Sequence, residues 1–212
     1  MSHDKIVSLF SQEKGYHFSR WNKPIAPVVF GIDNSSLASV KSAFLEVISI
    51  TPLPISDFDS DLGANFFVFF CSEWCELREI PNLNRLIPNL AQVLATLDKN
   101  NSNQYRTFFF KENGAINLCI LIMKYDLELA SVSVQTLAMG QMLKSILLWS
   151  PKAFATESPI AIINKNNSCI VKPFYEALLK ACYDATLPDF SMDKTHALRV
   201  QARVSKYTEE FK

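Results

Sequence analysis

The stretch ANFFVFFC (64–71) ends in six consecutive apolar residues, Phe66 to Cys71. A strand with one face in water alternates apolar and polar residues, whereas a continuous apolar run is typical of a strand that is covered on both faces. Such a strand needs packing partners on either side of its sheet. Residues 64–71 therefore predict an interior strand of a sheet that carries helices.

The rest of the chain shows apolar residues at the helical period or in short extended runs. These patterns predict, in order, a strand at 25–33, a helix at 34–50, the strand at 64–71, a helix at 82–98, a hairpin at 105–123, a helix between 126 and 150, extended pieces within 158–174, and helices at 173–185 and 191–212. The simplest architecture with this order is mixed α/β (α+β), with a single mixed sheet and helices packed on it.

Three local signals make the boundaries more specific. Asn34 or Ser35 can cap the amides of the first helix. Pro88 lies inside a leucine-rich helical pattern, where it kinks the helix or marks its first turn. Asn113 and Gly114 favour a tight hairpin turn, because both positions can adopt a positive φ.

The composition is that of one globular unit. Apolar residues make up 49% of the chain and charged residues 20%, so a sizeable core can form. Because no linker separates two units, we expect a single domain over residues 1–212, in which residues 1–19 are a candidate N-terminal extension. No apolar run is long enough for a transmembrane helix, and the N-terminus lacks the pattern of a signal peptide.

The charges are balanced, with 21 Lys and Arg against 21 Asp and Glu. A balanced chain gives no electrostatic reason to expect nucleic acid or an anionic membrane as a partner. The five glycines are too few and too scattered for a phosphate-binding loop or a dinucleotide fingerprint. We therefore expect no nucleic-acid partner and no nucleotide cofactor.

Metal-binding residue types do not form a complete pattern either. A zinc-protease helix carries H-E-x-x-H, because two His four residues apart share one helical face, whereas the three His of this chain lie far apart. Asp57, Asp59 and Asp61 occupy every second position, as do the first ligands of a calcium-binding EF-hand loop. The twelfth position of such a loop requires a bidentate Glu, but here it is Val68. We expect no bound metal.

A catalytic set assembled by the fold from distant residues is an alternative. An odd number of cysteines, five, does not predict a disulfide framework. Cys71 and Cys75 can form a local bridge or remain free, and a free thiol near His17 can form a Cys–His pair. This possibility defines an enzymatic hypothesis, a hydrolase built from a Cys or Ser and a distant His.

Five short motifs lie in order along residues 20–200: RWNKPI (20–25), GANFFVFF (63–70), SVQTLAMGQMLKSILLWS (133–150), SPIAIIN (158–164) and YEALLKACYDATLPDFSM (175–192). Together they resemble the bacterial family called domain of unknown function 2927, which includes lipoproteins. The resemblance implies a zincin-like outline, related to the zinc-dependent peptidases. It also implies a periplasmic or secreted protein, although no signal peptide is visible.

The resemblance also implies a degenerate metal site. It places Leu137 at the first His of H-E-x-x-H, Ala138 at the Glu and Gln141 at the second His. Leucine cannot bind zinc and alanine cannot act as a general base. The motif near the C-terminus departs from the family as well, with Asp189 and Phe190 where the family has a glycine.

We therefore expect a non-catalytic, degenerate metalloprotease-like domain that binds a partner, most simply a protein, and uses no cofactor. The hydrolase described above is one alternative. The other is a structural subunit of a larger assembly, for which sixteen Phe and three Trp can supply an apolar contact patch.

Overall fold

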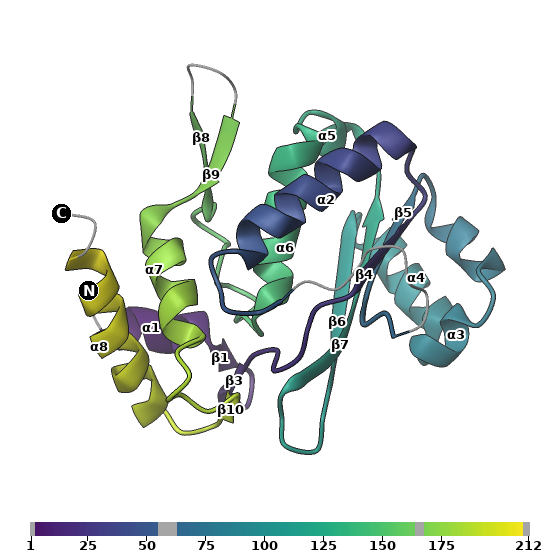
Figure 1. Ribbon diagram of the computed structural model, residues 1–212. Coiled ribbons are helices and arrows are strands. Elements are labelled where there is room, and N and C mark those ends of the chain that lie inside the picture. The colour runs from purple at the N-terminus through teal and green to yellow at the C-terminus, as the bar shows by residue number, and fades with distance from the viewer. Residues whose placement is uncertain (1–2, 55–62, 164–167, 210–212) are drawn as a thin grey trace.

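The predicted interior strand forms β5 (Phe66–Cys71) of a four-stranded mixed sheet. The computed structural model describes residues 3–54, 63–163 and 168–209. The strand order is β4–β5–β7–β6, with β4 at Pro27–Phe30, β7 at Ile116–Lys124 and β6 at Gln104–Phe110. β4, β5 and β7 are parallel, and β6 runs antiparallel at one edge. The mixed α/β class is confirmed (Figure 1).

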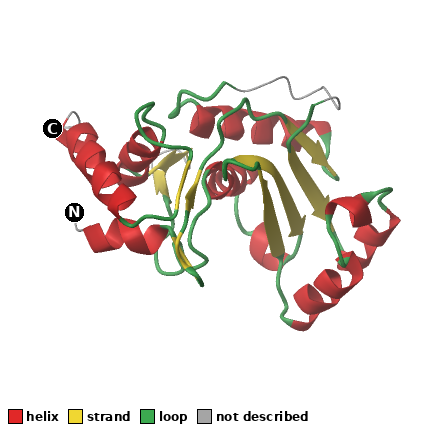
Figure 2. Cartoon of the chain, turned by 90° about the horizontal axis from the view of Figure 1, so that it is seen from below, coloured by secondary structure: helices red, strands yellow, loops and turns green. Residues whose placement is uncertain are grey.

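Helices cover both faces of this sheet, which is why the β5 sequence is apolar throughout. Phe66 and Val68 belong to the core that contains α2 (Asn34–Ile48) and α6 (Val134–Ile146). Phe69 points to the other core. That second core contains the 3-10 helix η1 (Trp74–Glu79), α3 (Leu83–Leu86) and α4 (Leu90–Lys99). Figure 2 shows helices on either side of the strands.

The cap of α2 differs from the prediction. The residue before the helix, Asp33, is the N-cap, and its carboxylate accepts hydrogen bonds from the amides of Ser35 at 2.8 Å and Ser36 at 3.0 Å. Neither Asn34 nor Ser35 caps the helix. An aspartate at this position satisfies two amides at once and carries a negative charge toward the positive end of the helix dipole.

Two other elements differ from their sequence patterns. Pro88 separates α3 from α4 instead of kinking one helix, and Asn89 adopts a left-handed conformation just before α4. The β6–β7 hairpin forms as predicted, but its turn is longer than two residues. Only Gly114 has a positive φ, and the Asn113 side chain accepts a hydrogen bond from the Ala115 amide at 3.1 Å.

The helix predicted between 126 and 150 is divided into α5 (Leu127–Ala130) and α6. Beyond it lie β8 (Ile160–Ile163) and β9 (Ser168–Val171), which form an antiparallel hairpin, then α7 (Pro173–Cys182), β10 (Phe190–Ser191) and α8 (Thr195–Glu209). No described helix is long and apolar enough to cross a membrane. The aspartates 57, 59 and 61 of the calcium-like loop lie outside the described residues.

The candidate N-terminal extension is part of the core. It contains α1 (His3–Leu9), β1 (Ser11–Gln12), β2 (Gly15–Tyr16) and β3 (Phe18–Ser19). Ile6, Phe10 and Phe18 have no exposed surface, and β3 pairs with β10 from the far end of the sequence. In Figure 1, α1 lies beside α7 and α8. Residues 3–19 are therefore integrated into the domain.

Arg20 joins the first and last motifs of the sequence. Its Nε atom donates to Asp189 Oδ1 at 2.8 Å. Its terminal nitrogens donate to the backbone oxygens of Cys182 at 2.7 Å, Asp184 at 3.1 Å and Leu187 at 2.8 Å. The motif RWNKPI is thus held against CYDATLPDF, and Asp189 of the second motif is the ion-pair partner of Arg20.

Candidate functional site

Two hollows lie along α6. Ser133 caps this helix by accepting the Thr136 amide at 3.2 Å, and the Ser133 to Ala138 segment follows α5 after a short turn. The helix packs against α2 on one side, and its other side meets side chains of β6. The hollows are here named the strand-end pocket and the α6 groove.

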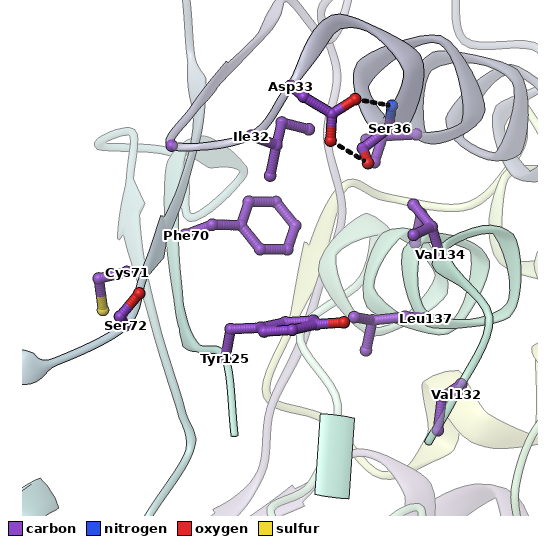
Figure 3. A pocket seen from close by; sticks show the side chains of 13 residues that line it. Ile32, Asp33, Ser36, Phe70, Cys71, Ser72, Tyr125, Val132, Val134 and Leu137 are labelled. Atoms are coloured by element: carbon purple, nitrogen blue, oxygen red, sulfur yellow. Dashed lines mark hydrogen bonds between the residues drawn. The ribbon is translucent and has the colours of Figure 1, made fainter. Parts of the chain in front are cut away.

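The strand-end pocket has a volume of about 350 Å³ and lies where the parallel strands end (Figure 3). Its walls come from the segments that follow β4, β5 and β7, and from the N-terminal turns of α2 and α6: Gly31, Ile32, Asp33, Ser36, Val40, Phe70, Cys71, Ser72, Tyr125, Val132, Val134, Leu137 and Ala138. In Figure 3 the Tyr125 ring lies across the pocket toward Leu137. The carboxyl ends of parallel strands are a common ligand position in open α/β sheets.

The α6 groove has a volume of about 510 Å³. One wall is α6 itself, through Thr136, Leu137, Gly140, Gln141 and Lys144. The other walls come from Gln104 of β6, Glu128 and Leu129 of α5, Val132, the segment 154–159, and Ile160 and Ile162 of β8. The groove therefore runs along one face of α6, between the sheet edge and the β8–β9 hairpin.

The two hollows adjoin, because Val132 and Leu137 line both of them. Three large apolar side chains that line the hollows are exposed, Tyr125, Val132 and Ile162, of which Ile162 is 58% exposed. Together the hollows form one extended surface feature with both apolar and polar walls.

Gln141 is buried and hydrogen-bonded to the edge strand. Arg106 Nη2 donates to Gln141 Oε1, and Gln141 Nε2 donates to Gln104 Oε1 at 2.9 Å. Arg106 Nε also donates to Ser145 Oγ at 3.0 Å, and Ser145 Oγ donates to the Gln141 carbonyl at 2.8 Å. Both ends of the Gln141 amide are thus engaged, and they tie α6 to β6.

Burial perturbs the titration of this cluster. Burial lowers the pKa of Arg106. Burial also lowers the pKa of Lys144, and the neighbouring positive charge of Arg106 lowers it further. Burial raises the pKa of the Cys119 thiol to about 12. Cys119 is therefore a protonated, inert thiol at neutral pH.

The structure places Leu137, Ala138 and Gln141, the positions that the resemblance assigns to a degenerate metal site, at the two hollows. Leu137 lines both, Ala138 lines the strand-end pocket and is 3% exposed, and Gln141 lines the α6 groove. None of the three side chains points a free metal-binding atom into a shared cavity. Across residues 3–54, 63–163 and 168–209, no group of three or more His, Cys, Asp or Glu could hold a metal ion.

The structure does not bring together the residues of the Cys–His hypothesis. The His17 ring packs on Phe110 and Phe190, with centroids 5.8 and 5.3 Å away. Cys71 Sγ donates to the Met123 carbonyl at 3.7 Å, and burial raises the pKa of this thiol to about 11. Cys71 and Cys75 are both free, so they form no local bridge, and Cys75 is exposed. Among the described residues, His17 therefore forms no activated Cys–His pair with Cys71 or Cys75.

Arg106 and Gln104, the partners of Gln141, were not identified from the sequence. They lie 35 and 37 positions before Gln141, so local spacing cannot connect them. One signal was present, since Arg106 is the only charged residue in the strand QYRTFFF. A lone charge in a strand that is covered by a helix requires a polar partner on the facing element.

A scan against protein-family models found no match, and searches of the curated proteins and of the solved structures found no significant match. The likeness to domain of unknown function 2927 therefore stays a prediction from the motifs. The functional assignment depends on the geometry of the two hollows.

Proposed function

We propose that this chain is a non-catalytic protein-binding domain that holds an extended segment of its partner along α6. The observation that carries the proposal is the adjoining pair of hollows, which share Val132 and Leu137 and have exposed apolar side chains at their rims. Burying such apolar surface is the main favourable term in protein association.

The edge strand supports an extended partner. The Lys124 amide donates to the Asn103 carbonyl at 2.9 Å, so Asn103 and Lys124 form a hydrogen-bonded pair. In an antiparallel pair every second residue is hydrogen-bonded to the partner strand. The backbone N–H and C=O groups of Gln104, Arg106 and Phe108 therefore point away from β7. Gln104 also lines the α6 groove. A partner segment in the groove can therefore pair with the start of β6, as peptides do in domains that bind by strand addition.

The chemistry of α6 supports a non-catalytic role. Leu137 and Ala138 offer no ligand or base, and the Gln141 amide is engaged by Arg106 and Gln104. The same three positions support our further proposal that the domain is a degenerate relative of the zincin-like peptidases. In this proposal the groove persists beside the helix that follows the hairpin, while packing residues replace the metal ligands.

Both parts of the proposal can be tested with one array of short synthetic peptides, probed with protein purified without chelator. We expect a subset of the peptides to bind, and the bound peptides to remain intact by mass spectrometry. We also expect the metal content of the protein to stay well below one equivalent, because no tetrahedral ligand set is present among the described residues.

Three results would contradict the proposal. Cleavage of bound peptides, or one equivalent of tightly held zinc, would show that the domain is an enzyme or a metalloprotein. Absence of binding across the whole array would contradict the protein-binding role. Sedimentation of the same preparation tests the alternative of a structural subunit, since a strict monomer at high concentration counts against self-assembly.

A further inference from the structure

The α6 groove has a positively charged end. Lys144 lies in the last turn of α6, lines the groove and is half-buried. Arg106 lies behind it, bonded to Gln141 and Ser145, and its charge acts on Lys144. Lys144 thus places one cation at this end of the groove, and the nearby buried Arg106 adds to the positive charge there.

The partners of this pair are neutral. Arg106 donates to an amide oxygen and a hydroxyl, which accept hydrogen bonds but carry no charge. None of the ion pairs recorded within the described residues includes Arg106 or Lys144. Partly buried like charges without a counter-charge are unfavourable, and an anion that enters the groove relieves that cost.

The two carboxylates that line the groove are engaged elsewhere. Glu157 pairs with Lys172 at 3.0 Å. Glu128 accepts a hydrogen bond from Asn103 Nδ2 at 3.1 Å and belongs to α5, beside the N-terminal end of α6. Thr136 and Lys144 are eight residues apart, which is roughly 12 Å along a helix. The groove is therefore acidic at its α5 end and basic at its Lys144 end.

We infer that the groove selects partner segments that carry an acidic side chain, whose carboxylate pairs with Lys144 at the C-terminal end of α6. This inference rests on the proposed protein-binding function and names the chemistry of the partner. A polyanion such as nucleic acid fits poorly, because Lys144 is the only cationic residue among the described residues that line the groove, and the chain has no net positive charge. A single carboxylate in an apolar segment satisfies both the basic end and the apolar walls.

The test uses the peptide array in matched triplets, whose members differ only by Glu, Gln or Lys at one position. For the peptides that bind, we expect the Glu member to have a dissociation constant about tenfold lower than the Gln member, and the Lys member to bind most weakly. In Lys144→Gln the preference for Glu should disappear while the Gln member binds as it does to the wild type. Lys99→Gln, on α4 across the sheet, removes the same charge and should keep the preference.

The outcomes separate the two proposals. The carboxylate inference is overturned if the Glu and Gln members of a triplet bind equally well to the wild type. It is also overturned if the preference for the Glu member persists in Lys144→Gln. Both results leave the proposed binding function intact. An array with no binding peptide overturns the function and the inference together. Loss of the preference in Lys99→Gln as well would trace it to net charge and would also overturn the inference.

Discussion

Arg20→Met is expected to lower the free energy of unfolding by about 3–5 kcal/mol, measured by urea denaturation followed with tryptophan fluorescence. Arg20 is 7% exposed, and its guanidinium donates to Asp189 and to three backbone carbonyls of the segment 182–187. Removing it leaves these carbonyls without their donor and Asp189 without its ion pair. A domain is usually stable by only about 5–15 kcal/mol, so the loss is large.

Two further variants identify which contacts cause this effect. Asp189→Asn keeps an oxygen that can accept from Arg20 Nε, and the Asp189 side chain is partly exposed, so its effect should stay near or below about 1 kcal/mol. Arg20→Lys keeps the charge but cannot reach all four acceptors, and its effect should lie between the other two. If Arg20→Met destabilises no more than Asp189→Asn, the carbonyl contacts contribute little and the account of this clamp is wrong.

Gln141→Leu is expected to destabilise the domain by about 2–3 kcal/mol, although leucine suits a buried helix face. The substitution leaves Arg106 Nη2 and Gln104 Oε1 without the partner that they have in the wild type. A stability change within about 0.5 kcal/mol of zero would mean that the buried bonds between α6 and β6 are not needed to hold the helix in place.

Gln141→Glu is the matched control, because it keeps an oxygen for Arg106 and adds a carboxylate. The Arg106 charge should lower the pKa of this carboxylate in the folded state below the ordinary Glu value of about 4.3. Its contribution to stability should then be present above that value and be lost as the pH falls through the lower, folded pKa. Thermal unfolding between neutral and acidic pH measures this loss, which Gln141→Leu should not show.

The sheet and its helices could be predicted from the sequence because their signals are local. The apolar run 64–71 indicated a strand covered on both faces, and β5 contacts two cores. Asn113 and Gly114 placed the hairpin at the right position, although its turn is longer than expected. Periodicity and turn residues carry this information within a few residues of each element.

The site could be predicted only in part, because its contacts join distant segments. The sequence singled out Leu137, Ala138 and Gln141, and all three line the hollows along α6. It did not indicate which residue would be the partner of Arg106. It also gave no sign that Arg20 would reach Asp189, 169 residues later. Such pairings depend on how the helices pack on the sheet, which local propensity does not determine.

Filling the α6 groove at Gly140 tests the central claim most directly. Gly140 lines the groove, and a Cβ atom there would meet only Ile160 Cγ1 at 3.9 Å, which is ordinary van der Waals contact. Gly140→Ala should leave peptide affinity unchanged and stabilise the helix by about 0.5–1 kcal/mol. Gly140→Phe places a ring in the groove, so the dissociation constant of an array-selected peptide, measured by fluorescence anisotropy, should rise at least about tenfold. A folded Gly140→Phe that binds the peptide as tightly as Gly140→Ala would contradict the account.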